Sequence, residues 1–440
     1  MAAEALAGWE QAARQAAQRS AHAEAIAHLR LALAQLASLP EAPARDRHEL
    51  RLQLLLASRL IATAGYGASA VEAVYGRALA LCRRVDDRVA LNKVRLGLEG
   101  YHFMRADFAR AGAIAAEVAA SLGPDADPLA RIQSRWAQAN LLFHQGQALP
   151  ALALMDHCLA DYPSLGHRPV AVQDPGVMCL CYSSWALWQL GRADESLQRA
   201  HKAVQLAERL NHPFSLGEAL GFLAVSHYFR GEPAAGLAAA QRAVEVCENG
   251  GFAVWLAHAK LVQGRLMAEL GQPEAGLAAM AQGHAMWGAT GAVVTLPFYL
   301  ALQAEGLALA GQTALAQDRV EQALALIARH GERYYQPELL RLKGVLLLQA
   351  GAPAEAAEPW LQQSLACAQA LQMSGLALKS TIALAGLQAA TGRREAAIDG
   401  LQAALAALDQ GQDTRDPQQA LALLAGWQAR PNPGEHGCSI

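Results

Sequence analysis

A glycine recurs along most of this chain at a nearly constant spacing, and this regularity is the strongest constraint on its fold. The seven positions are Gly146, Gly191, Gly231, Gly271, Gly311, Gly351 and Gly392, separated by 45, 40, 40, 40, 40 and 41 residues. Glycine readily adopts the left-handed backbone conformation that many tight turns need. A chain that turns at each position builds a series of similar units, each of which contacts mainly its neighbours.

Small residues flank every turn at fixed distances. Seven residues before the glycine stand Ala139, Ser184, Ala224, Gly264, Ala304, Gly344 and Ala385, and five residues after it stand Ala151, Ser196, Gly236, Gly276, Ala316, Ala356 and Ala397. Two helices approach closely only where both carry small side chains. The spacing therefore predicts helix, tight turn and helix, the pattern of the tetratricopeptide repeat. Its usual period is about 34 residues, so the longer period predicts longer helices.

The same pattern continues upstream in weaker form, with turns at Ala106, Gly65 and Ser20. We therefore expect an all-α, right-handed superhelical solenoid of about ten hairpins over residues 1–408. Asp416 and Pro417 indicate the N-cap and first residue of a capping helix within 409–429, and a disordered tail would follow at 430–440. The proline- and glycine-rich segment 163–176 is either a functional loop or a tolerated insertion.

Composition narrows the class of function. The formal net charge is −3 with no basic stripe, which predicts no nucleic-acid partner. No apolar run approaches the roughly 18–20 residues of a membrane helix, so no membrane association is expected. Seven scattered cysteines without a C-x-x-C pair, and an N-terminus unlike a secretory signal, favour a reduced, cytoplasmic compartment.

Signals for catalysis are poor. The 14 histidines form no H-E-x-x-H motif, and neither G-x-S-x-G nor a phosphate-binding G-x-x-x-x-G-K-[ST] occurs. Asp156, His157 and Cys158 are adjacent, but neighbours on a helix point about 100° apart and cannot meet. We therefore predict a protein that is not an enzyme and that uses no metal and no cofactor.

Two strings resemble a known region of larger proteins. They read QDPGVMCLCYSSWALWQLG from 173, continuing through LNHPFSLGEAL to 231, and LLLASRLIATAGYGASAVEAVYGRALALCRRV over 54–85. They are similar to the tetratricopeptide-rich C-terminal region of bacterial regulators that fuse a class III cyclase or a protein kinase to a STAND-type ATPase. The resemblance covers roughly residues 30–425 and includes Trp185, Trp188 and Gly291. It implies the sensing or docking part of such a regulator, without its motor or catalytic parts.

The candidate binding surface follows from position within the repeat. In tetratricopeptide stacks the first helix of each hairpin lines the concave side, at about 10, 6, 3 and 2 residues before the turn. These offsets, with nearby polar groups that could orient a ligand, give Phe103, Trp136, Asn140, Phe143, His144, Trp185, Trp188, Glu218, Tyr228, His258, Arg265 and Glu305. An exposed apolar patch of this kind usually marks binding. The alternative is that a tight superhelix buries its own inner wall and these side chains are core.

Two functions remain open from the sequence. The first is a non-catalytic scaffold in bacterial signalling or regulation that captures a protein or peptide partner in its concave groove. The second is a sensor that binds a small molecule in an aromatic-lined central pocket. A closed pocket near Trp185 would favour the sensor, and an open, continuous channel would favour the protein partner.

Overall fold

The computed structural model of this protein describes residues 2–19, 21–123, 125–166 and 172–429, and these ranges contain helices and no strand. The helices are α1 (Ala2–Gln18), α2 (His22–Ala37), α3 (Pro43–Ala64), α4 (Ser69–Val85), α5 (Arg88–Met104), α6 (Phe108–Ser121), α7 (Pro128–His144), α8 (Ala148–Asp161), the 3-10 helix η1 (Tyr162–Leu165), α9 (Pro175–Gln189), α10 (Ala193–Arg209), α11 (Pro213–Arg230), α12 (Pro233–Gly250), α13 (Ala253–Glu269), α14 (Pro273–Ala289), α15 (Leu296–Leu309), α16 (Thr313–His330), α17 (Gln336–Gln349), α18 (Ala354–Ala370), α19 (Ser374–Ala390), α20 (Arg394–Ala406) and α21 (Arg415–Gln428).

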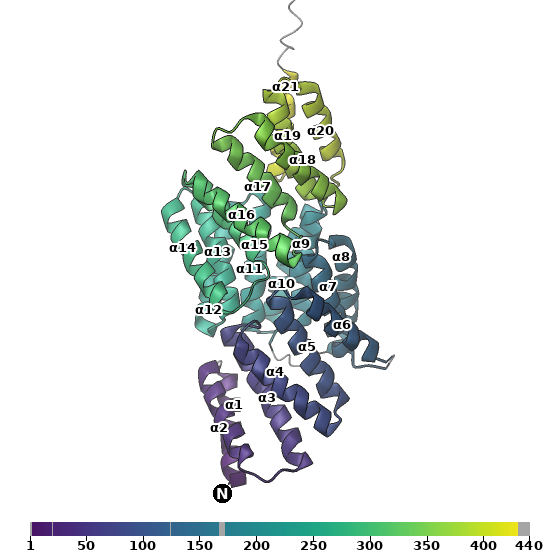
Figure 1. Ribbon diagram of the computed structural model, residues 1–440, viewed down its shortest axis with the longest axis vertical. Helices are drawn as coiled ribbons and strands as arrows, with labels where there is room; N and C mark the ends of the chain where they lie inside the picture. Colours follow the sequence, from purple (N-terminus) through teal and green to yellow (C-terminus); the bar gives the residue numbers. More distant parts are fainter. Residues whose placement is uncertain (1, 20, 124, 167–171, 430–440) are drawn as a thin grey trace, which may run out of the picture.

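Successive helices pair into hairpins 1 to 10, from α1–α2 to α19–α20, and α21 follows the last of them. The hairpins stack along the long axis of the molecule from the N-terminus to α21 (Figure 1). This arrangement confirms the predicted fold, an all-α, right-handed superhelical solenoid of about ten tetratricopeptide-like hairpins. No helix in the described part of the chain combines the length and apolarity needed to cross a bilayer.

The turns and the small-residue contacts form as the spacing predicts, with one exception. All seven turn glycines have φ between +75° and +85°. The small residues on both sides of the turns are buried, except that Ala356 is exposed and Ala357 takes its place. The reason is that Pro353 precedes α18, which begins three residues after Gly351, whereas the helices after the turns at Gly231, Gly271 and Gly311 begin two residues after the glycine.

The C-terminal helix differs from the prediction at its start. Thr414 occupies the N-cap of α21, so Asp416 and Pro417 lie inside the first turn and the predicted N-cap at Asp416 is wrong. The tail predicted at 430–440 lies outside the described residues, as do residues 167–171 of the 163–176 segment. At the end of that segment, the Asp174 side chain caps α9 by accepting a hydrogen bond from the Val177 backbone N–H at 3.0 Å.

Hairpins five positions apart also touch, so the superhelix completes about one turn every five hairpins. The carbonyl of Met104, at the end of α5, accepts from the backbone N–H of Val293 at 2.7 Å, just before α15. The carbonyl of His144 at the end of α7 likewise accepts from Arg333 at 2.7 Å, before α17. Gln189, at the end of α9 in hairpin 5, also donates to the Tyr334 carbonyl at 3.2 Å, just before hairpin 9 and so four hairpins later. These contacts bind one turn of the superhelix to the next.

The closest helix approach offers a direct test of the small-residue rule. A Cβ built on Gly276 would lie 2.4 Å from the carbonyl oxygen of Gly264, well inside van der Waals contact. We predict that Gly276→Ala lowers the free energy of unfolding by roughly 1–3 kcal/mol, measured by chemical denaturation. The control Gly76→Ala sits on exposed α4 with no atom within 4 Å of its Cβ and should be neutral or slightly stabilising. Equal stability of both variants would contradict the packing described.

Candidate functional site

The residues predicted to line the concave side are mostly buried. Phe103, Asn140, Phe143, His144, Trp185, Trp188, Glu218, Tyr228, His258 and Arg265 are at most 7 % exposed, and Trp136 and Glu305 are half-buried. Several of them contact rings from other turns of the superhelix. An open channel through the centre, which would favour the protein partner, is not formed by these residues, because their side chains fill the space.

Aromatic rings from successive turns of the superhelix meet across the axis. The Phe143 ring lies 5.0 Å from the Tyr334 ring, between hairpins 4 and 9, and Trp185 lies 5.3 Å from Phe298, between hairpins 5 and 8. Trp185 also packs at 4.4 Å against Phe222 of the next hairpin. Centroid distances of this size are those of packed aromatic pairs in cores. This closely packed centre is neither the closed pocket nor the open channel considered from sequence, and it agrees with the alternative that the superhelix buries its own inner wall.

The other predicted residues separate into groups. The ring centroids of Trp136 and Tyr182 lie 5.1 Å apart on one side of the centre, and those of Phe103 and His144 lie 4.9 Å apart. Trp188 stacks on Phe229 at 5.4 Å, farther towards the C-terminal end. Three residues, Tyr228, Arg265 and Glu305, come together beyond it in direct contact.

Ionisable groups in the filled centre are held neutral by burial. Burial raises the pKa of Glu99, Glu218 and Glu332 to about 8. It lowers the pKa of His144 and His258 to about 4. One oxygen of Glu218 accepts a hydrogen bond from Gln173 at 3.1 Å, and the other has no partner among the described residues. The centre is therefore a neutral, aromatic core at pH 7.

The raised carboxyl pKa values predict the direction in which the free energy of unfolding changes with pH. Folded Glu218 keeps its proton up to about pH 8, whereas the unfolded side chain loses it near pH 4.5, so stability falls as pH rises through this window. We predict that Glu218→Gln flattens this loss by roughly 1–3 kcal/mol between pH 5 and 9, measured by urea denaturation. Glu245→Gln, on the exposed face of α12, should leave the pH dependence unchanged. Parallel pH profiles for Glu218→Gln and the unmodified chain would contradict the assignment.

A cavity of about 420 Å³ opens where the filled centre ends, at the C-terminal end of the axis. It is lined by the first helices of hairpins 6 to 10 and by α21. The lining residues are Tyr228, Phe229, Arg265, Glu305, Arg341, Val345, Lys379, Ile382, Ala383, Gly386, Arg415, Asp416, Gln419 and Leu423. Volumes in this range are typical of ligand sites. The candidate functional site is this cavity, called the axial cavity below.

One side of the axial cavity carries an ion-pair network around Arg265. This guanidinium donates to Glu305 at 2.6 Å and to Glu269 at 2.8 Å, and it lies 5.1 Å from the centre of the Tyr228 ring. The Tyr228 hydroxyl donates to the same Glu305 oxygen at 2.5 Å. Although burial opposes ionisation, Arg265 and then Lys379 lower the pKa of Glu305. Arg415 of α21 pairs with Glu269 and closes the network on that side.

The facing side is organised by Glu338, which lies beneath the cavity surface. Arg341 donates two hydrogen bonds to it, at 2.9 and 2.7 Å, and Lys379 donates a third at 2.8 Å. Despite its burial, Glu338 is ionised, because Arg341 and Lys379 hold its pKa well below the usual value. The carboxylate fixes both basic side chains at the cavity wall, beside the apolar Val345 and Ile382.

Only part of the axial cavity was predicted from the sequence. Tyr228, Arg265 and Glu305 were named, whereas Arg341, Val345, Ile382 and Gly386 were missed. The signal was present: Val345 and Gly386 stand six residues before Gly351 and Gly392, as Arg265 and Glu305 do before their own glycines. Extending the same offsets to the last two hairpins would have found them. Asp416 and Arg415 lie on α21, outside the repeat, so no offset indicates them.

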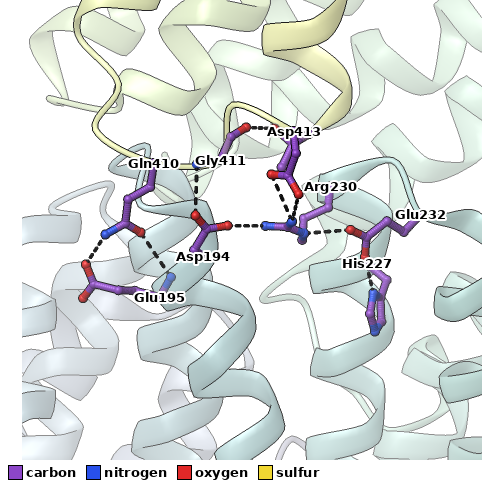
Figure 2. Close-up of polar contacts among 9 residues, drawn as sticks. Asp194, Glu195, His227, Arg230, Glu232, Gln410, Gly411 and Asp413 are labelled. Carbon is purple, nitrogen blue, oxygen red and sulfur yellow. Dashed lines mark hydrogen bonds and ion pairs between the residues drawn. The ribbon is translucent and has the colours of Figure 1, made fainter.

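The wall formed by α21 is fastened to hairpins 5 and 6 by a buried arginine (Figure 2). Arg230, 7 % exposed, donates to Asp194 at 2.9 Å, to Glu232 at 2.8 Å and to Asp413 at 3.2 Å. Beside it, the Gly411 backbone N–H donates to Asp194 at 3.3 Å. These contacts join the start of α10 and the end of α11 to the segment before α21.

A substitution at Arg230 should loosen this wall. Arg230→Met keeps the aliphatic stem but removes every charged hydrogen bond, so we predict faster amide hydrogen exchange over 411–428 and little change in α7 and α8. The loss of the charged hydrogen bonds should lower local stability by roughly 1–3 kcal/mol. The loss is not larger because the freed carboxylates regain water. Arg242→Met, which breaks an exposed pair with Glu208, should leave the exchange of α21 unchanged. Unaltered exchange in both variants would contradict the fastening role.

The fold and the cavity define a tetratricopeptide-like solenoid with a ligand-sized cavity at one end of its axis. No family model matches the chain. An uncharacterized protein of Rhizobium meliloti (strain 1021) is 25% identical over 363 residues, which are 78% of this chain and 34% of that protein. The chain therefore spans about a third of the length of this curated relative.

Solved structures with the same fold come from proteins with different ligands. NprR in complex with its cognate peptide NprX has a TM-score of 0.54 at 11% identity, covering 87% of this chain and 99% of that one. A Rap protein complexed with Competence and Sporulation Factor has a TM-score of 0.53 at 12% identity, covering 89% and 99%. The human IFIT1 dimer with m7Gppp-AAAA has a TM-score of 0.53 at 13% identity, covering 89% and 87%. At these identities the likeness shows the fold alone.

Proposed function

We propose that this protein is a non-catalytic binding module that captures a short segment of a protein or peptide partner in its axial cavity. The observation that carries the proposal is the cavity itself, where charged and apolar side chains from six helices converge at the C-terminal end of the axis. Charged walls with fixed geometry give orientation, and apolar walls give affinity. The peptide and protein complexes of NprR and Rap support this choice.

The size of the axial cavity limits what enters. About 420 Å³ lies within the range of small-ligand sites, so only a short segment fits. A long helix laid along the whole superhelix is disfavoured, because the aromatic rings occupy the central axis. The same volume supports the second candidate function, a sensor for a small molecule.

An RNA ligand, as in the IFIT1 complex, is disfavoured by the charges present. Every basic side chain of the axial cavity forms an ion pair with an internal carboxylate. Binding of a polyphosphate chain relies on basic groups that neutralise successive phosphates.

We further propose that the chain acts in a bacterial signalling protein of the cyclase or kinase and STAND type, in the cytoplasm. Its match to about a third of a longer, uncharacterized relative supports a place within a larger protein.

A cavity-filling substitution tests the site. Gly386 lines the cavity and has no atom within 4 Å of a built Cβ, so Gly386→Phe should fill it without disturbing α19. The protein is purified from its native cells, and co-purified molecules are released by acid and identified by mass spectrometry. We predict released peptides from the unmodified chain and at least a tenfold loss from Gly386→Phe.

The matched control is Gly76→Phe, on the exposed face of α4, where the built Cβ also meets nothing within 4 Å. It should retain the peptides. Retention by Gly386→Phe as well would place binding elsewhere on the molecule. Release of a single non-peptide metabolite that Gly386→Phe loses would establish the sensor in place of the peptide module.

A further inference from the structure

The axial cavity contains one carboxylate that its own network leaves unused. Asp416 lies in the first turn of α21, lines the cavity and is 9 % exposed. Within the described ranges, its side chain forms no hydrogen bond and no ion pair. An acidic residue in a first helical turn interacts favourably with the helix dipole, but that interaction does not require burial. Burial raises the pKa of this carboxyl, and a cationic group bound beside it would favour its ionised form.

A second unused acceptor belongs to Glu305. Tyr228 and Arg265 both donate to its Oε2 atom, and no described residue donates to Oε1. Glu305 also lines the axial cavity. Two acidic side chains with uncommitted oxygen atoms therefore line the same cavity, and a primary ammonium group has three donors to offer them.

Unused donors lie in the same cavity. Arg341 commits its Nε and Nη2 atoms to Glu338, which leaves Nη1, and Lys379 donates to Glu338 through one of its three N–H groups. Lys379 and Arg341 both act electrostatically on Asp416, so donors and acceptors are neighbours. A carboxylate is the group that such cations bind most strongly.

The charge balance selects a ligand with both groups. The cavity network has four cations, Arg265, Arg341, Lys379 and Arg415, and four acids, Glu269, Glu305, Glu338 and Asp416. A ligand with only an ammonium group, or only a carboxylate, would add one uncompensated charge to this balanced network. A neutral molecule with one group of each sign adds no net charge.

We propose that the axial cavity binds a short free peptide by its two ends, with the ammonium group on Asp416 and Glu305 and the carboxylate on Arg341 and Lys379. Val345, Ile382 and Leu423 contact the apolar side chain between the ends. This inference rests on the proposed function, since it assigns the ligand of the same cavity. A free amino acid offers the same two end groups and is the other source of this chemistry.

Calorimetry with blocked peptides tests the assignment. The probes are tripeptide mixtures with an apolar central residue, prepared with free ends, with an acetylated N-terminus, with an amidated C-terminus and with both, together with free leucine. We predict that free-ended tripeptides bind and that each single block weakens binding by roughly tenfold or more. Leucine that binds as tightly as the tripeptides supports the zwitterion site and identifies the amino acid as its ligand.

Substitutions assign each end to its residues. In Asp416→Asn the effect of N-acetylation should shrink to less than about threefold, while the effect of C-amidation persists. In Lys379→Gln the reverse should hold. Asp399→Asn, the same change on the exposed face of α20, should bind like the unmodified chain. If Asp416→Asn melts well below the unmodified chain, Glu305→Gln takes its place in the cycle.

Two results overturn the inference. Equal binding of free and blocked tripeptides shows that the ends are not recognised, while the cavity remains the peptide site. No binding of any free-ended probe also rejects it. The Gly386→Phe variant tests the proposed function separately. If peptides are released from the native protein and lost in that variant, the proposed function stands even when no free-ended probe binds.

Discussion

The close contact of two helices at paired small residues sets the geometry on which the rest of this structure depends. Gly264 and Gly276 show its extreme, since neither position has room for a single methyl group. Because nearly the same contact recurs about every 40 residues, each hairpin adds a similar rotation and translation to the stack. Five such steps return the chain to its starting side, and this is why Met104 meets Val293 and His144 meets Arg333.

The helix order, the turns and the inner-facing positions could be predicted because they are properties of one repeat. Gly231 turns with φ +79°, and Trp185 faces the axis as its offset indicates. Burial could not be predicted, because it depends on the number of hairpins per superhelical turn. That number follows from small angles between neighbouring helices, which side-chain patterns do not specify. Trp185 is therefore core, since Phe298 of a later hairpin covers it.

The same reasoning explains why the cavity lies at one end of the axis. The inner faces of hairpins 4 and 5 are covered by aromatic residues of hairpins 8 and 9, such as Tyr334. Hairpins 6 to 10 have no complete later turn of the superhelix beside them, and α21 closes over the cavity that they line. Charged residues replace aromatic ones where this cover ends, as Arg265, Glu305 and Arg341 show. The array ends before its inner wall is fully buried, and this leaves room for a ligand.

The five-hairpin contacts also bear on how such a chain can change during evolution. In an open solenoid, duplication or deletion of one internal repeat merely alters its length. Here a lost hairpin would place the Met104 carbonyl opposite the wrong loop, and every other partner across the turns would shift with it. A hairpin added after α20 would keep these contacts but would cover Lys379 and the cavity beside it. A change in the number of repeats would therefore alter the binding site as well as the length of the molecule.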